Sequence, residues 1–312
     1  MQFLGLYGIY LESCKIIFNF RRIFGKISLA FILPLSLIFL ANIAVSDSLS
    51  SEGAVFWLVE FVYLTFLLVF FVLSSSAVVY TVASVYIGYD VTFGKVMSVI
   101  PQVWKRLMVT FLCAFLAIFL CNVLLVVPII LWNWRVTIKH VDRDGFVFFR
   151  AVLMLYVVVI LYVVVIVYMT MVWWLAGVIS VLEDIKGIQA MTKSRNLIQG
   201  KMWIAIVFLL KLEAAIYGIQ ILFESQVVHN GSFGVAGRLA FGFLCLLMLF
   251  SVVLFGLVTE TVIYFVCKSY HHEYINKLSL SDHLDEDQTN ISVVEKGLDM
   301  YDRVIKSEPA QL

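Results

Sequence analysis

Charged residues are scarce in this sequence, and their scarcity indicates the class of protein. Asp, Glu, Lys and Arg make up 14% of the 312 residues, whereas soluble domains carry about 25%. Hydrophobic residues make up 62%, and the mean hydropathy is +1.01. Water is therefore excluded as the main solvent of the chain, and we expect an integral membrane protein.

Signatures of catalysis and of cofactor binding are also missing. The sequence has no G-x-S-x-G, no G-x-x-x-x-G-K-[ST] and no H-E-x-x-H motif. Its five cysteines include no C-x-x-C pair, and four of them lie in or beside apolar runs, which favours membrane packing over a metal or redox site. We therefore predict no enzymatic activity, no catalytic or metal site, and no cofactor.

An excess of positive charge is absent as well. The net charge is +1, and the basic residues form short clusters between apolar runs rather than one stripe, so we expect no nucleic-acid partner. The first residues lack the basic segment and sustained apolar core of a secretory signal, so we expect no cleaved leader.

Long apolar runs are what the sequence does contain. About 20 apolar residues cross a bilayer as a helix, and unbroken runs favour helices over the ten-residue alternation of barrels. We predict an all-α, polytopic transmembrane helical bundle of about six spanning helices with interfacial amphipathic helices. The runs are residues 27–45, 54–87, 107–132, 146–182, 202–223 and 239–267.

The distribution of Lys and Arg between these runs predicts the orientation. One side carries 16 of them and the other five, of which four lie in residues 133–150. The positive-inside rule then places both termini in the cytosol. We divide the chain into a cytosolic amphipathic segment (1–26), a transmembrane domain (27–267) and an acidic cytosolic tail (268–312), with nine acidic and five basic residues in the tail.

A loose repeat links three basic, apolar stretches, residues 11–26, 93–107 and 187–201. Each leads into a spanning run, so we expect amphipathic helices at the cytosolic interface, with a pseudo-threefold arrangement if the sixth crossing packs beside the first. Ordinary solvated connecting helices are the alternative. Pro101 predicts a bend or break in the second stretch. The candidate headgroup-binding residues are Lys95, Lys105, Arg106, Lys193, Arg195 and Lys201.

Charges inside the spans are candidate functional residues because hydrocarbon disfavours them. They are Glu60, Lys211, Glu213 and Glu260. We expect Lys211 to meet Glu60 or Glu260 on another helix, in an ion-pair network that fixes helix packing or, alternatively, in a proton or ion relay.

Two further features have a structural and a functional interpretation. Glu183 and Asp184 follow the fourth run, where they either favour the dipole of the next helix or bind a cation. Asn230 begins an Asn-Gly-Ser sequon in a loop predicted to lie outside the cytosol, so it is a possible glycosylation site.

Several stretches also resemble known families. LESCKIIF from Leu11, SSAVVYTVASVY from Ser75, and GKVMSVIPQVWKRLMVTF from Gly94 resemble a plant family of uncharacterised multi-pass membrane proteins, some labelled as binding a polyadenylate-binding protein. SVLEDIKGIQAMTKSRNLIQGKMW from Ser180 carries the same resemblance to the plant family. The stretch from Val181 to Trp203 is also similar to the E-x-x-G-x-x-A-x-x-x-S-x-x-L-x-x-G pattern of bacterial multi-pass proteins and of the membrane domain of some glycerophosphodiester phosphodiesterases. Glu183, Gly187, Ala190, Ser194, Leu197 and Gly200 occupy its positions, with Gly187 displaced by one residue. No phosphodiesterase domain is present, so that activity is not implied.

Two functions follow as hypotheses. The first is a non-enzymatic membrane protein that organises lipids, or protein partners bound through the tail, at the cytosolic face. It predicts anionic-lipid binding that weakens when Lys193, Arg195 and Lys201 are neutralised. The second is a transporter or channel that uses Lys211, Glu213 and Glu60, and it predicts a water-accessible cavity around Lys211.

Overall fold

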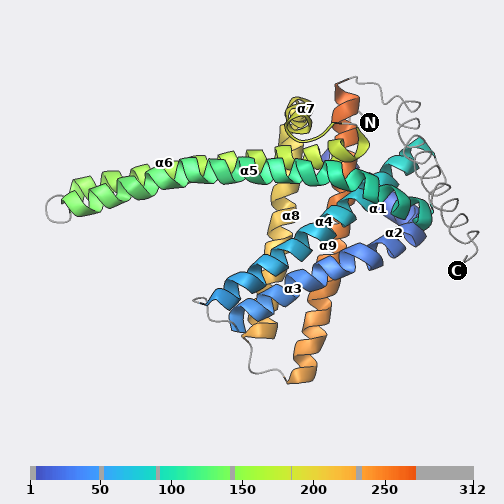
Figure 1. Ribbon diagram of the computed structural model, residues 1–312, viewed down its shortest axis with the longest axis horizontal. Coiled ribbons are helices and arrows are strands. Elements are labelled where there is room, and N and C mark those ends of the chain that lie inside the picture. The colour runs from blue at the N-terminus through green and yellow to red at the C-terminus, as the bar shows by residue number, and fades with distance from the viewer. Residues whose placement is uncertain are drawn as a thin grey trace, which may run out of the picture.

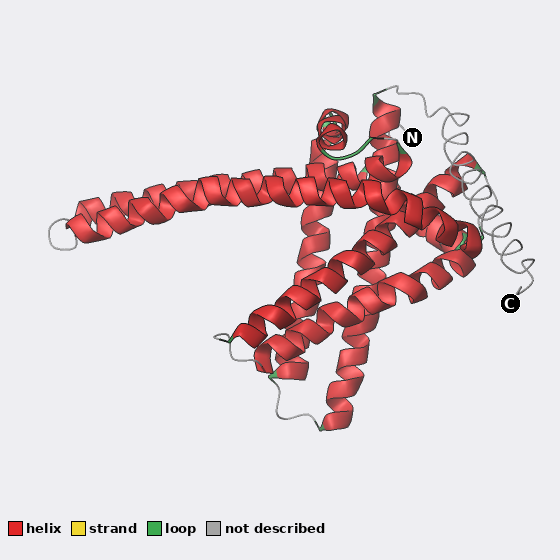
Figure 2. Cartoon of the chain, in the orientation of Figure 1, coloured by secondary structure: helices red, strands yellow, loops and turns green. Residues whose placement is uncertain are grey.

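The fold is built from helices throughout the described part of the chain (Figure 2). The computed structural model describes residues 5–48, 53–88, 92–140, 145–183, 185–229 and 234–271. The elements are α1 (Leu6–Asn19), α2 (Arg21–Ile27), the π-helix η1 (Ser28–Ile32), α3 (Leu33–Ser48), α4 (Ala54–Ile87), α5 (Phe93–His140), α6 (Gly145–Leu182), α7 (Ile188–Ile198), α8 (Met202–Phe223), the π-helix η2 (Glu224–Val228) and α9 (Val235–Tyr270).

Six helical segments are long and apolar enough to cross a membrane, which confirms the predicted all-α polytopic bundle. They are Arg21–Ser46, Val55–Tyr86, Val103–Leu124, Val152–Leu182, Met202–Val228 and Val235–Tyr270. The chain is therefore a multi-pass integral membrane protein. At 1.5 Å per residue α4 is about 50 Å long, more than the roughly 30 Å of a hydrocarbon core, so it must tilt or project.

The larger of two buried hydrophobic clusters lies at one end of the bundle. It contains the C-terminal parts of α4, α6 and α9 together with α1, α7 and the beginning of α5. Ser74, Ser75, Ser76 and Ala77 of α4 are all buried, and residues 256–267 of α9 are buried without interruption. Small side chains let helix backbones approach closely in a membrane, so this end is held by close helix contact.

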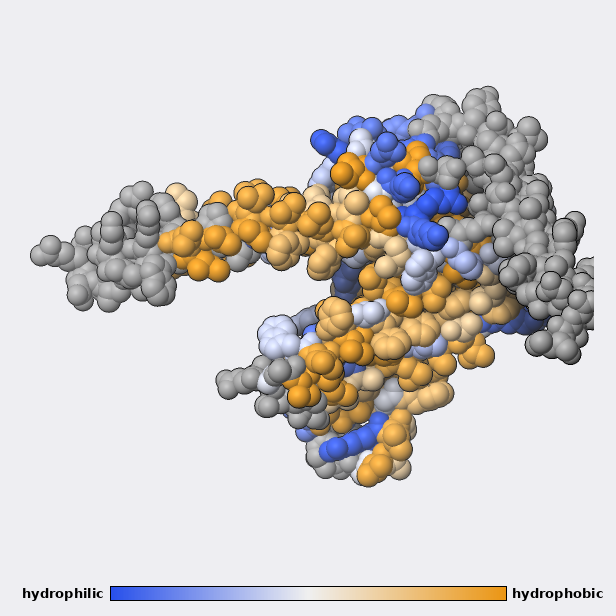
Figure 3. All heavy atoms as spheres, in the orientation of Figure 1, coloured by the Kyte–Doolittle hydropathy of each residue, from blue (hydrophilic) through white to orange (hydrophobic). Residues whose placement is uncertain are grey.

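A long arm extends from that core. Figure 1 shows α5 and α6 running side by side away from the other helices, and Figure 3 shows hydrophobic residues along most of its described surface. Leu112, Phe115 and Leu116 of α5 are more than half exposed. The Tyr162 hydroxyl donates a hydrogen bond to Asn122 Oδ1 across the arm, 2.5 Å away. The outer surface of the arm is apolar, as expected for a surface that lipid surrounds.

The second basic stretch does not form a separate interfacial helix. Residues 93–107 are the first turns of α5, which continues without a break through Pro101, so the predicted break is wrong. A proline removes the hydrogen-bond donor for the carbonyl one turn earlier. Pro101 and Met97 are both at the surface, so water or a headgroup can bind that carbonyl.

The contact required by the proposed repeat is present. α9, the sixth crossing, packs against α1 and α3 of the first unit. The first and third basic stretches form separate helices, α1 with α2, and α7. The threefold arrangement itself stays a prediction, because the second unit differs.

Candidate functional site

The candidate site is centred on α7, the short helix between the fourth and fifth spans. α7 packs against α6, α5 and α9. Figure 1 places it close to the C-terminal end of α9, and Figure 3 shows hydrophilic side chains gathered over that end of the molecule. A polar helix therefore lies at the end of an otherwise apolar bundle.

One carboxylate joins α7 to the rest of the bundle. Glu183, just after α6, forms an ion pair of 2.6 Å with Lys193 of α7 and one of 2.8 Å with Lys268 of α9. The Tyr264 hydroxyl donates a further hydrogen bond of 2.8 Å to Glu183, and Lys268 also donates to the Tyr264 oxygen at 3.1 Å. We call these four residues the Glu183 latch. It connects three segments through one partly buried acid.

The surroundings of Glu183 favour its ionised form. Burial by itself raises the pKa of the carboxyl, but hydrogen bonds from Lys193, Lys268 and Tyr264 outweigh it and hold the pKa below its ordinary value. The side chain of Glu183 is 14% exposed. The latch is therefore charged at neutral pH, with a partner on each side of the carboxylate.

Two glycines fix the ends of α7. Gly187 has φ +62°, and its N–H donates 2.9 Å to the Thr110 hydroxyl of α5. A Cβ at Gly187 would lie 3.3 Å from Cys113 Sγ. Gly200 has φ +99°, and a Cβ there would lie 2.5 Å from the ring of Tyr270. Only glycine tolerates both the left-handed backbone and the close contact.

The inner face of α7 is made of the small and apolar positions of the bacterial pattern. Ala190, Ser194 and Leu197 are all buried. Ser194 donates a hydrogen bond of 2.8 Å to the backbone carbonyl of Val172 in α6. A residue such as leucine at position 190 or 194 would push α7 off α6. The pattern therefore reflects the packing of α7 against α6 and not a catalytic site.

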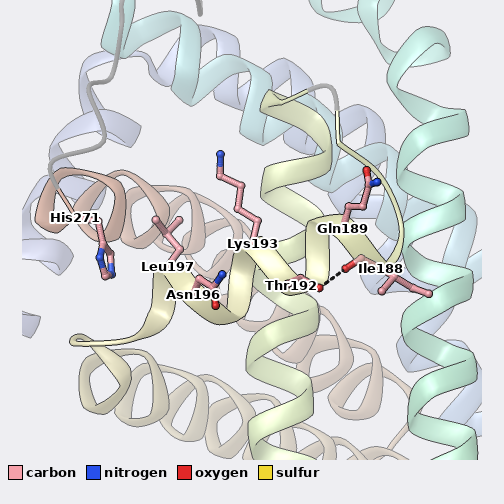
Figure 4. A pocket seen from close by; sticks show the side chains of 7 residues that line it. All are labelled: Ile188, Gln189, Thr192, Lys193, Asn196, Leu197 and His271. Carbon is pink, nitrogen blue, oxygen red and sulfur yellow. Dashed lines mark hydrogen bonds between the residues drawn. The ribbon is translucent and has the colours of Figure 1, made fainter.

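The outer face of α7 borders an open cavity of about 540 Å³. Ligand sites commonly have volumes of about 300 to 1,000 Å³. Figure 4 shows the side chains around it, six from α7 and one, His271, from beyond the end of α9. The lining residues are Ile188, Gln189, Thr192, Lys193, Asn196, Leu197 and His271. Most carry hydrogen-bonding groups.

Three of these groups are already engaged with the protein. Lys193 belongs to the latch, and the Thr192 hydroxyl donates to the Ile188 carbonyl at 2.9 Å. His271 Nε2 lies 2.8 Å from the Gln199 carbonyl, to which it donates. The lining is therefore held in place, which favours a preformed polar site.

The basic residues around α7 differ in how they are held. Lys186 and Arg195 are exposed. Lys193 and Lys268 pair with Glu183, and Lys201 lies over the ring of Tyr270, with Nζ 5.2 Å from the ring centroid. Of the other headgroup candidates, Lys95 and Lys105 are exposed and Arg106 is partly buried, all three in the first turns of α5.

The intramembrane charges do not converge as predicted. Lys211 and Glu213 are exposed on α8, and Glu60 is partly exposed on α4. The contact of Lys211 is with Tyr10 of α1, whose ring centroid lies 5.8 Å from Nζ. Within the described residues Lys211 forms no ion pair with Glu60 or Glu260, so that prediction is wrong. Glu260 is 7% exposed and lies inside the core.

The helix-dipole explanation for Glu183 and Asp184 is also wrong. α7 begins at Ile188, and its first turn contains no acidic residue. A turn around Gly187 separates Glu183 from the helix, so the carboxylate points to lysines instead. Asp184 and Asn230 lie outside the described residues, as does the predicted tail beyond His271.

Tyr264 and Lys268 are site residues that the sequence did not predict. They are four residues apart, which places them on one face of α9. A tyrosine and a lysine on one face at the end of the last span could have indicated a polar site there. The bonding partner, Glu183, is 81 residues away in sequence from Tyr264. Across the described ranges, no group of three or more His, Cys, Asp or Glu residues is placed to hold a metal ion.

Comparison with known proteins gives a family. A search of the curated proteins found no match, and neither did a search of the solved structures. A family model described as a domain of unknown function, DUF8558, matches residues 1–52 and 44–299, which together make up most of the 312 residues. The chain therefore belongs to the DUF8558 family.

Proposed function

We propose that this integral membrane protein is non-enzymatic and organises anionic lipids through α7 at the cytosolic face of its membrane. The observation that carries the proposal is the construction of α7. Its inner face packs on α6 through Ala190 and Ser194, the Glu183 latch ties the helix to α9, and its outer face presents polar groups and Lys193 beside an open cavity. Basic interfacial helices attract anionic headgroups.

Residues at the beginning of α7 and just after it are suited to a membrane interface. Ile188 is 73% exposed and Trp203, just after α7, is 79% exposed. Tryptophan is enriched where a chain passes from hydrocarbon to headgroups. Lys186 and Arg195 lie in the same segment and are exposed. Apolar anchors beside cations favour a bound lipid whose phosphate meets α7 and whose chains follow the bundle.

The structure identifies which cations to neutralise. Lys193 is held by Glu183 and Lys201 by the Tyr270 ring, so removing either charge also disturbs the fold. Lys186 and Arg195 have no such structural role among the contacts described above. Each basic residue near an anionic surface contributes about 1 kcal/mol, or roughly fivefold in binding.

The experiment uses the full chain in detergent micelles mixed with phosphatidylcholine or phosphatidylserine, with bound lipid counted by native mass spectrometry. The K186Q/R195Q variant is expected to bind phosphatidylserine roughly 25-fold more weakly and phosphatidylcholine unchanged. The single variants K186Q and R195Q are each expected to bind phosphatidylserine roughly fivefold more weakly, and R238Q, which removes one positive charge near the opposite end of α9, is the control for each of them. Equal binding by wild type and K186Q/R195Q, or an equal loss in R238Q, would refute the proposal.

The acidic tail supports a secondary proposal of a protein partner. Residues 268–312 carry nine acidic residues, and a polar charged tail is typical of segments that bind partners. Deletion of residues 273–312 is expected to leave lipid binding unchanged and to remove any tail-dependent partner. The lipid proposal does not depend on this outcome.

A further inference from the structure

A surface on the outer side of α8 is unusual for a helix that crosses a membrane. α8 packs through its other side against α9, α6 and α3 (Figure 1). The buried residues of that packed side are Phe208, Leu209, Leu212, Ile219 and Phe223. The outer side is exposed and combines an apolar stripe with two charges, Lys211 and Glu213.

The apolar stripe has the spacing of a helix-to-helix contact. Its residues follow one another at alternating intervals of three and four, and all are exposed: Val207, Leu210, Ala214, Tyr217 and Ile221. A repeat of about 3.5 residues keeps one stripe of a helix facing a second helix over several turns. We call these five residues the α8 seam. The small Ala214 at its centre allows a second helix backbone to approach closely.

The two charges border the α8 seam on opposite edges. Lys211 and Glu213 are the neighbours of Leu212, which is buried, so they lie about 100° to either side of it around the helix. They are about 14 and 17 Å from the beginning of α8 at Met202, near the middle of a hydrocarbon core of about 30 Å. A cation and a carboxylate thus lie at nearly the same depth in the membrane.

Neither charge is balanced within the described part of the chain. Lys211 contacts the ring of Tyr10, 5.8 Å from Nζ, which carries no charge. Among the described residues none forms an ion pair or a side-chain hydrogen bond with Lys211 or Glu213. Two residues apart on a helix, they also do not face each other. Charges at this depth almost always face other protein and are paired, so lipid alone is a poor cover for this side of α8.

We propose that the α8 seam is the interface of a two-fold symmetric dimer of this chain, in which Lys211 of each copy pairs with Glu213 of the other. A two-fold axis along the membrane normal turns the lysine edge of one seam toward the glutamate edge of the second. The paired residues then differ in depth by about 3 Å, the rise of two residues. Both copies keep the same orientation in the membrane.

The order of the charges selects a second copy of the chain as the partner. One cation and one carboxylate on opposite edges make the surface complementary to itself, so a single contact balances all four charges. Contacts of this isologous kind close on themselves, and two-fold dimers are the commonest symmetric assembly. A single stripe faces a single helix, which favours two copies over a larger ring. The α8 seam shares no residue with α7 or its cavity, so the dimer is independent of lipid binding.

The test reverses the charges in the full chain, reconstituted at low density in phosphatidylcholine vesicles. Stepwise photobleaching of one fluorophore per chain counts the copies in each spot, and the wild type is expected to form dimers. K211E places two carboxylates on each edge and E213K two lysines, so each variant is expected to dimerise at least about tenfold more weakly. K211E/E213K restores opposite charges and should recover the dimer. K105E, which reverses an exposed lysine of α5, is the control and should dimerise as the wild type does.

A mixture of the two single variants tests pairing between copies directly. A K211E chain beside an E213K chain has opposite charges on both edges, so chains labelled in two colours are expected to form mixed dimers in preference to dimers of either variant alone. A defect in the fold of each variant would not be repaired by mixing. A wild type that stays monomeric at every density, undiminished dimers of both single variants, or no excess of mixed dimers would overturn the proposal.

Cross-linking of a variant that keeps both charges covers the case in which the reversed variants do not fold. A214C places a thiol at the centre of the seam, and oxidation with copper phenanthroline is expected to join position 214 of two copies, as mapped by mass spectrometry. V164C, at a position of α6 that is 59% exposed, is the control and should stay unlinked. Equal linking of A214C and V164C, or none in A214C, would contradict a dimer through the α8 seam.

Discussion

At the level of single residues, Glu183 joins segments that are distant in the sequence. It meets Lys193 of α7 and Lys268 of α9 at 2.6 and 2.8 Å, and its side chain is 14% exposed. Hydrogen bonds to charged groups stabilise a protein by about 1.5 to 3 kcal/mol. Two lysines share this acid, so its loss removes an ion pair from each of them.

E183Q is expected to lower the free energy of unfolding by about 1 to 3 kcal/mol at neutral pH. Because the pKa of Glu183 is lowered in the folded protein, the contribution of the carboxylate is complete above the unfolded pKa of about 4.3 and is lost as the pH falls through the lower folded pKa. The difference between wild type and E183Q should therefore shrink on acidification below about pH 4.3. Thermal unfolding in micelles at a series of pH values measures it.

The matched control for this measurement is E224Q, which removes an exposed carboxylate at the start of η2. It changes the total charge by the same amount without touching the latch. A difference between wild type and E183Q that stays constant down to pH 3, or one that E224Q reproduces, would contradict the assigned role of Glu183.

At the level of elements, the contact between α8 and α9 depends on a glycine. Gly256 of α9 is buried, and a Cβ built on it would lie 3.0 and 3.1 Å from the two methyl carbons of Leu212 in α8. Distances of that kind leave no room for a larger side chain unless the leucine moves. Close helix approach through small residues is a main source of helix association in membranes.

G256V is expected to destabilise the protein by about 1 to 3 kcal/mol, as overpacking of a filled core does. G218V is the matched control, because Gly218 of α8 has no atom within 4 Å of its Cβ position. Thermal unfolding in micelles compares the two variants. Combining G256V with L212A should recover part of the lost stability, and equal midpoints for G256V and G218V would show that the contact is unimportant.

At the level of the whole molecule, the six spans place α7 at one end of α8 and the end of η2, Val228, at the other. The chain passes from η2 to α9, which begins at Val235, so a cytosolic α7 requires the connection that contains Asn230 to be on the other side of the membrane. The arm of α5 and α6 adds a large apolar surface that only lipid or another apolar partner can cover.

Expression in microsomes tests this topology. A glycan is expected at Asn230, with loss in N230Q, and none at the second sequon beginning at Asn290. Tags on the two termini should both be open to protease from the cytosolic side. A sequon engineered between residues 141 and 144, in the other connection predicted to lie outside the cytosol, provides a second glycan acceptor and should also be glycosylated. Glycosylation at Asn290 would reverse the orientation and move α7 out of the cytosol.

The apolar runs determined the class and the number of crossings, because hydrocarbon forces each spanning segment to satisfy its own backbone hydrogen bonds. The run 54–87 predicted α4 to the residue, and Glu260 was recognised as an intramembrane charge. The bounds of a span and the presence of a charge within it are local properties, so the local composition is sufficient to predict them.

Only the tertiary structure decided which side chains meet. Glu183 binds Lys268, which is 85 residues away in the sequence. Lys211 contacts Tyr10 instead of a carboxylate, and α5 continues through Pro101. Contacts between distant segments depend on how helices rotate and cross, and apolar periodicity leaves both undetermined when every face of a helix is apolar. For that reason the spans were predictable, and the site at α7 emerged from the packing.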